Sequence, residues 1–168
     1  MKSNIILIGM PTSGKSTAGV ILAKVTGRDF IDTDLLIQKR CGKKLSEIIG
    51  SEGLDAFLRI EADACKDVEE TGSVIATGGS VVYCGDAMRH LKSTGTIVYL
   101  EIDLDTLKKR LHNARKRGVV LKDGQSIEDL YAERTPLYEK YADITVSQTG
   151  LDMEETVHTI LTHLGSDF

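Results

Sequence analysis

A segment near the N-terminus combines the residue types and the spacing that bind phosphate. It reads Gly9-Met10-Pro11-Thr12-Ser13-Gly14-Lys15-Ser16-Thr17, which fits the pattern G-x-x-x-x-G-K-[ST]. Glycines let the backbone turn successive N–H groups toward a phosphate, and the helix that follows adds partial positive charge. We expect this loop to bind ATP, with Lys15 bridging the β- and γ-phosphates and the Ser16 hydroxyl ligating Mg²⁺. An ordinary glycine-rich turn is the competing interpretation.

A pair of carboxylates, Asp32 and Asp34, follows the second short apolar run. If they lie near the γ-phosphate, one can hold water on Mg²⁺. The other can orient the acceptor hydroxyl and take its proton as the new P–O bond forms. The alternative is a helix N-terminus, with Asp32 or Thr33 as the cap and Asp34 in the first turn. The two interpretations are compatible.

Three further features could serve the same chemistry. Gly78-Gly79 ends an apolar run and would let the backbone approach a ligand closely. The basic segment Lys108-Lys109-Arg110…Arg115-Lys116-Arg117 is either a solvated helix face or a lid over the ATP phosphates, which would exclude water. Arg134 could bind a substrate carboxylate, or it could pair with Glu133 or Glu139.

The elements that must position these residues alternate between strands and helices. Short apolar runs predict strands over Ile5–Ile8, Phe30–Ile31, Val74–Ala76, Thr96–Leu100 and Ile144–Val146. Helices are expected over Ser16–Val25, Leu45–Ile49, Leu54–Val68, Leu104–Leu111 (capped by Asp103), Ser126–Tyr141 and Met153–Leu164. This order predicts an α/β fold with a parallel sheet covered on both faces. Ligands bind at the carboxyl ends of such strands, where the glycine loop, Asp32 and Gly78 all fall.

Composition excludes several classes. The 168 residues are expected to form a single domain, 1–168, and a net charge of -4 argues against binding to nucleic acid or an anionic membrane. No apolar run is long enough to span a membrane. The three cysteines suggest neither a disulfide framework nor a zinc site, so we expect a protein of the reducing cytoplasm. We also expect a monomer. The asparagines, Asn4 and Asn113, form no N-K-x-D motif, which excludes a GTPase. Glu101 is interpreted as a strand end and not as a second magnesium carboxylate.

Over nearly its whole length the sequence resembles the shikimate kinase family. The motifs that carry the resemblance are the glycine loop, Asp32 and Asp34, Phe57-Leu58-Arg59-Ile60-Glu61, Gly78-Gly79-Ser80, Arg110, Arg117, and Arg134-Thr135-Pro136-Leu137-Tyr138. The resemblance implies a three-layer, nucleoside-monophosphate-kinase-like fold with a five-stranded parallel sheet. It also implies acceptor-binding helices within 33–62 and a lid over 112–122.

The resemblance further assigns roles to residues. Catalysis would fall to Lys15, Asp34 and Arg117. ATP would be bound by the loop from Gly9 to Thr17, including Thr12, Ser13 and Gly14, together with Arg110 and Arg117. The metal ligands would be Ser16 and Asp32. The acceptor would contact Asp34, Leu58, Gly78, Gly79, Ser80 and Arg134.

The departures from the family pattern fall mainly on the acceptor side. Leu58 stands where the family has an arginine that grips the shikimate carboxylate, and Ser80 replaces a third glycine. Gly118-Val119-Val120 replaces proline-leucine-leucine, and Thr12 occupies a position that is often glycine. Shikimate is the leading acceptor, and its product would be shikimate 3-phosphate. The alternatives are another small hydroxy acid, such as homoserine, and a non-catalytic nucleotide-binding regulator.

Overall fold

The central feature of the computed structural model, which describes residues 3–113 and 121–165, is a five-stranded parallel sheet. Its strands are β1 (Asn4–Ile8), β2 (Asp29–Asp32), β3 (Ser73–Ala76), β4 (Gly95–Glu101) and β5 (Ile144–Ser147), in the order β2-β3-β1-β4-β5. Every neighbouring pair runs parallel. The expected α/β class and sheet are therefore confirmed.

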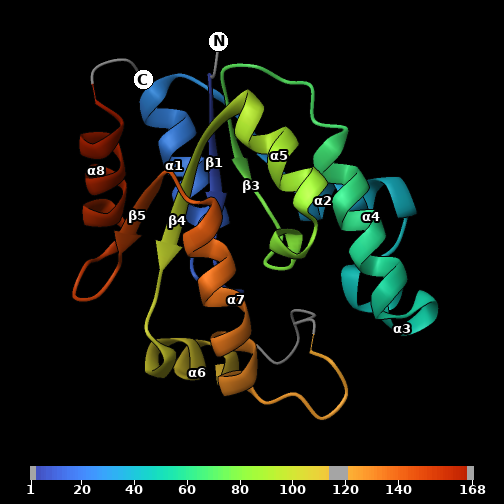
Figure 1. The fold of residues 1–168 in the computed structure, drawn as a ribbon. Helices are drawn as coiled ribbons and strands as arrows, with labels where there is room; N and C mark the ends of the chain where they lie inside the picture. The colour runs from blue at the N-terminus through green and yellow to red at the C-terminus, as the bar shows by residue number, and fades with distance from the viewer. Residues whose placement is uncertain (1–2, 114–120, 166–168) are drawn as a thin grey trace.

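Helices cover both faces of this sheet. On one face lie α1 (Lys15–Thr26) and α8 (Met153–Leu164), which pack against each other. On the other lie α5 (Gly85–Thr94) and α7 (Ile127–Tyr141), both in contact with β4 (Figure 1). The helix α6 (Leu104–Asn113) lies beyond the end of β4.

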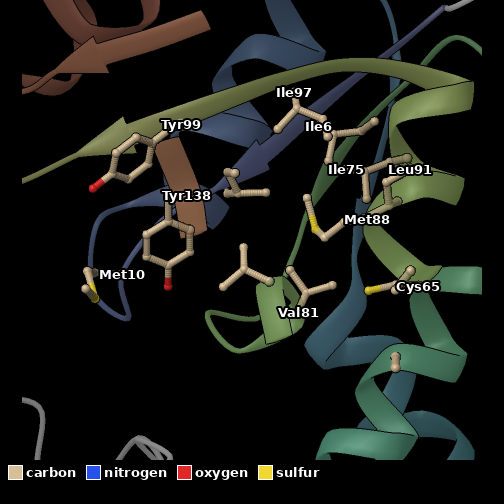
Figure 2. Close-up of a cluster of buried hydrophobic side chains, with 14 of the residues drawn as sticks. Ile6, Met10, Cys65, Ile75, Val81, Met88, Leu91, Ile97, Tyr99 and Tyr138 are labelled. Carbon is tan, nitrogen blue, oxygen red and sulfur yellow. The ribbon is translucent and has the colours of Figure 1, made fainter. Parts of the chain in front are cut away.

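The central strand β1 is buried on both faces, which explains its unbroken apolar run Ile5–Ile8. Ile5 and Leu7 belong to the core on the side of α1 and α8, whereas Ile6 and Ile8 belong to the core on the opposite side. That second core includes Tyr99 and Tyr138, whose rings stack with centroids 5.1 Å apart (Figure 2). A strand buried on both faces needs apolar residues at every position.

Three helices form a smaller packing unit on one side of the sheet: α2 (Thr33–Cys41), α3 (Leu45–Glu52) and α4 (Leu54–Lys66) (Figure 1). Their shared core is Ile37, Ile48, Phe57 and Ala64. This unit contains the segment 33–62 and ends at Lys66. It places Glu61 of α4 beside the turn that follows β3, where Ser80 donates to it.

The helix α5 was not predicted from the sequence. Its buried residues Ala87, Met88 and Leu91 have the i, i+1, i+4 spacing of an amphipathic helix. The short 3₁₀ helix η1 (Val81–Tyr83), which precedes α5, was also not predicted. Within the described ranges, no helix combines the length and the apolar character needed to cross a membrane.

The carboxyl ends of the strands meet at one end of the molecule. In Figure 1 the arrowheads of β1, β3 and β4 all point toward the end where α6 lies. Gly9 follows β1, Asp32 closes β2, and Thr77-Gly78 follows β3. The fold therefore brings the segments singled out in the sequence to one edge of the sheet.

Candidate active site

The loop between β1 and α1 wraps around the ammonium group of Lys15. Lys15 is 8% exposed, and its Nζ donates to the main-chain oxygens of Gly9 at 2.9 Å and Met10 at 2.7 Å. Burial lowers the pKa of Lys15 to about 8, an effect that Asp34 opposes. The charge is thus held inside the loop, where a phosphate would meet it.

The same loop contains an unusual backbone conformation. Thr12 has φ 65°, and it is the one non-glycine residue with positive φ in the described ranges. This left-handed conformation disfavours β-branched residues, which explains why glycine is common at this position. The main-chain oxygen of Thr12 accepts a hydrogen bond from Arg110 Nη1 at 2.9 Å. Arg110 on α6 is therefore brought to the loop from almost a hundred residues away.

Asp32 connects the loop to the start of α2. Its Oδ1 caps the helix by accepting from the N–H groups of Asp34 at 2.9 Å and Leu35 at 3.3 Å. Its Oδ2 accepts from the Ser16 hydroxyl at 2.7 Å. The helix-cap role expected for Asp32 is confirmed, and it leaves one carboxylate oxygen beside Ser16. A hydroxyl and a carboxylate are ligands that suit Mg²⁺ bound together with nucleotide phosphates.

The turn after β3 is the point where the acceptor-side residues meet. A Cβ on Gly78 would lie 1.8 Å from Glu61 Oε1 and 2.9 Å from Asp34 Oδ1. A Cβ on Gly79 would lie 3.0 Å from Arg134 Nη1 and 3.1 Å from Pro11 of the phosphate loop. Two carboxylates, one guanidinium and the loop therefore converge where the backbone carries no side chain.

The two carboxylates at this turn both have raised pKa values. Burial, followed by the nearby charge of Asp32, raises the pKa of Asp34 to about 6, and Lys15 opposes this effect. Burial raises the pKa of Glu61 to about 7, although a hydrogen bond from Ser80 acts in the opposite direction. A carboxylate with a pKa near 6 suits the role of a general base at neutral pH.

Arg134, which is 1% exposed, is held by two tyrosines. Its Nε donates to the Tyr83 phenol oxygen at 3.2 Å, and it also forms a hydrogen bond with Tyr138. The Tyr138 hydroxyl in turn donates to the main-chain oxygen of Gly79 at 2.6 Å. The ion pair of Glu133 is made with Lys122, at 2.9 Å.

Two of the departures from the family pattern, Leu58 and Ser80, lie within the described residues. Leu58 is half-buried on α4, one turn before Glu61, while its neighbour Arg59 is exposed. Ser80 is 3% exposed, and its hydroxyl donates to Glu61 Oε2. Its φ of -96° is open to any residue, so serine replaces glycine here without backbone strain. Arg117 and Gly118-Val119-Val120 lie outside the described residues, as does most of the segment 112–122.

Comparison with known proteins identifies the family. A model of the family described as "Shikimate kinase" matches residues 11–165. The chain belongs to the shikimate kinase family. A shikimate kinase from Francisella philomiragia is 37% identical over 165 residues, covering 96% of this chain and 94% of that one. A shikimate kinase from Francisella tularensis is 36% identical with the same coverage. Membership makes this chain an ATP-dependent phosphotransferase with an alcohol group as acceptor.

Solved structures agree with this membership. A shikimate kinase from Acinetobacter baumannii in complex with shikimate superimposes with a TM-score of 0.90 at 28% identity, covering 98% of this chain and 94% of that one. A shikimate kinase from Aquifex aeolicus gives a TM-score of 0.83 at 34% identity, with 96% and 95% covered. A deoxyadenosine kinase from M. mycoides, 14% identical with a TM-score of 0.57, shares the fold. The expected nucleoside-monophosphate-kinase-like fold is confirmed.

Sequence reasoning gave no role to several residues that this shikimate kinase family member places in or beside the site. Glu61 was quoted only as part of a motif, and Tyr83 was not considered. Gln148, 8% exposed after β5, donates from Nε2 to the main-chain oxygen of Ser13 at 2.8 Å. A signal existed for Glu61, because a glutamate on the apolar side of a helix needs a partner. No local signal pointed to Tyr83 or Gln148.

Proposed function

We propose that this protein transfers the γ-phosphate of ATP to a hydroxyl of shikimate, forming shikimate 3-phosphate. The observation that carries the proposal is the convergence at Gly78-Gly79. Asp34 Oδ1 lies beside Gly78, while Arg134 Nη1 and Pro11 of the phosphate loop lie beside Gly79. A base, a carboxylate-binding cation and the phosphate loop are therefore within reach of one small hydroxy acid. The similar shikimate kinase from Acinetobacter baumannii was solved in complex with shikimate, which supports the same acceptor.

The proposed reaction assigns one task to each side chain. Asp34 orients the acceptor hydroxyl, and its carboxylate takes the proton as the oxygen attacks the γ-phosphorus. The bond between that phosphorus and the β–γ bridging oxygen breaks, so ADP leaves. Lys15 balances the charge that shifts onto the phosphates, and Arg134 holds the acceptor carboxylate.

The proposed metal is Mg²⁺, bound with ATP. Ser16 Oγ and Asp32 Oδ2, which are 2.7 Å apart, would hold it. When bound, Mg²⁺ neutralises charge on the phosphates. Arg110, tied to the loop through Thr12, and the loop itself are proposed to bind the nucleotide. Arg117 is proposed to act from a lid over 112–122. Gly78, Gly79, Ser80 and Leu58 complete the proposed acceptor site, which belongs to the single domain 1–168.

The proposed setting is the cytoplasm, which supplies ATP, and the proposed assembly is a monomer. All three cysteines are free in this structure, which suits a reducing compartment.

The test is a panel that measures ADP release with shikimate, homoserine, gluconate and nucleoside monophosphates. We expect shikimate to give the highest kcat/KM and Lys15→Ala to abolish turnover while the protein stays folded. A preference for homoserine would contradict shikimate as the acceptor, whereas the proposed phosphoryl transfer from ATP would stand. ADP release that stays at background with every acceptor would indicate a nucleotide-binding regulator. A Lys15→Ala variant that kept more than about a tenth of the turnover would contradict the role of the loop.

A further inference from the structure

The half-buried side chain of Tyr83 in η1 lies between Arg134 and a cluster of charged residues. Its ring packs against the Arg134 guanidinium, with Cζ 5.2 Å from the ring centroid, and against the Lys122 ammonium at 5.5 Å. Its phenol oxygen accepts from Arg134 Nε at 3.2 Å. Lys122 in turn forms an ion pair with Glu133, with Nζ 2.9 Å from Oε1. Tyr83 therefore contacts both Arg134 and Lys122, the cation that pairs with Glu133.

The phenol oxygens of Tyr83 and Tyr138 orient the guanidinium of Arg134. A phenol has one proton to donate and lone pairs that accept. A guanidinium has no acceptor, so toward Arg134 the phenol oxygen of Tyr83 can only accept. The Tyr138 proton goes to Gly79, so that oxygen also can only accept from Arg134. Two fixed acceptors determine the plane and the direction of the guanidinium, whose Nη1 faces Gly79.

This orientation matters more in this chain than in one with a second arginine. Leu58 supplies no donor, and Arg59 is exposed. Binding of an acceptor carboxylate therefore depends mainly on Arg134. Recognition of a carboxylate by one guanidinium depends on two parallel N–H···O bonds, so a rotated guanidinium loses much of it.

We propose that Tyr83 is a positioning residue for Arg134 and thereby determines the affinity for the acceptor carboxylate. The proposal deepens the proposed function and rests on it. Tyr83 is not needed to anchor its own turn, because its neighbours Val81 and Val82 are 1% and 2% exposed in the core. A role confined to folding would therefore predict little effect of losing the phenol oxygen.

The experiment compares the wild type with Tyr83→Phe, which keeps the ring, and Tyr83→Leu, which also removes the contacts with both cations. The matched control is Tyr131→Phe on α7. It loses a phenol hydrogen bond to the main-chain oxygen of Ile102 (3.1 Å) and lies one turn before Arg134. For Tyr83→Phe we expect the KM for shikimate to rise about tenfold, with kcat, the KM for ATP and Tm nearly unchanged. Tyr83→Leu should raise this KM further, and the control should match the wild type.

A second measurement does not depend on the acceptor. The ¹⁵N-¹H signal of Arg134 Nε, assigned by its loss in Arg134→Lys, should exchange with solvent faster in Tyr83→Phe than in the wild type. If the wild type does not phosphorylate shikimate but this exchange accelerates, the proposed function fails and the positioning of Arg134 stands. The inference is overturned if the wild type uses shikimate and Tyr83→Phe leaves its KM unchanged. It is also overturned if kcat and Tm fall together with affinity, which would indicate a structural role.

Discussion

Leu58 and Glu61 lie one turn apart on α4, on the proposed acceptor side of the site. Glu61 is 1% exposed and carries a hydrogen bond from Ser80. The nearby charge of Arg134 acts to lower the pKa of Glu61, against the larger effect of burial. The half-buried side chain of Leu58 is apolar, so a carboxylate placed beside it would lose water without gaining a partner.

Replacing Leu58 therefore tests the acceptor directly. Leu58→Arg would place a cation at i−3 from Glu61, on the same helical face. We expect the KM for shikimate to fall about tenfold, because a charge-assisted contact to the carboxylate is gained. Steady-state kinetics with shikimate and homoserine would measure this effect, and kcat/KM for homoserine should fall. Leu58→Gln, which is long but uncharged, should give little of the gain. Efficient use of shikimate by the wild type that Leu58→Arg lowers would contradict the expectation.

At the scale of elements, the turn between β3 and η1 is what joins the two halves of the site. The Thr33 hydroxyl on α2 accepts from the Gly78 N–H at 3.2 Å, and Tyr138 on α7 donates to the Gly79 oxygen. Helices from both sides of the molecule thus hold one turn, and the absence of side chains there brings Glu61, Asp34 and Arg134 close to it.

Adding a methyl group to this turn should separate those residues. In Gly78→Ala the new Cβ would meet Glu61 Oε1 at 1.8 Å, so the carboxylates must move. We expect kcat/KM for shikimate to fall about a hundredfold, the usual effect of misplacing catalytic groups by an ångström. The matched control is Gly85→Ala at the start of α5. Its Cβ would make ordinary contacts, at 3.4 Å to Arg89 Nη1 and 3.5 Å to Tyr141 Oη. Equal activity losses in Gly78→Ala and Gly85→Ala would contradict the claim that the site requires a residue without a side chain at position 78.

At the scale of the whole molecule, the site imposes a cost on stability that depends on pH. Glu61 has a pKa raised from 4.5 to about 7, and Asp34 one raised to about 6. Below about pH 4.5 Glu61 is protonated in both the folded and the unfolded state. Between about pH 4.5 and 7 the unfolded chain releases the Glu61 proton while the folded protein retains it, and above about pH 7 the folded protein holds a buried charge. Stability from this source is therefore lost as pH rises.

Glu61→Gln should remove that loss, because glutamine resembles the protonated glutamate. We expect the variant's free energy of unfolding to exceed the wild type's by more at pH 8 than at pH 5, with a difference of about 2 kcal/mol. Urea unfolding at the two pH values would measure it. Glu69→Gln, at an exposed position, is the control and should show no such trend. A Glu61→Gln effect that is the same at both pH values would overturn the prediction.

Much of this molecule could be predicted from local patterns. The three inner strands could be predicted because a strand buried on both faces is a continuous apolar run, as Ile5–Ile8 is. The edge strands β2 and β5 are more exposed, and they were predicted from the short runs Phe30–Ile31 and Ile144–Val146. The helix cap at Asp32 and the phosphate loop could be predicted for a similar reason, since capping and phosphate binding depend on neighbouring backbone N–H groups. The helix α5 was missed although Ala87, Met88 and Leu91 have helical spacing. Their segment also contains glycine, serine and threonine, which weaken a prediction based on pattern alone.

The sequence by itself determined which chemistry this protein is equipped for. The phosphate-binding residues Gly9, Gly14, Lys15 and Ser16 lie in one short segment, so their spacing along the chain sets their arrangement. The tertiary structure decided which distant residues share the acceptor site. Glu61 meets Ser80 and Asp34, and Tyr83 meets Arg134, across separations of 19 to 51 residues. Such contacts depend on how strands are ordered in the sheet and how helices pack on it, and no local pattern encodes that geometry.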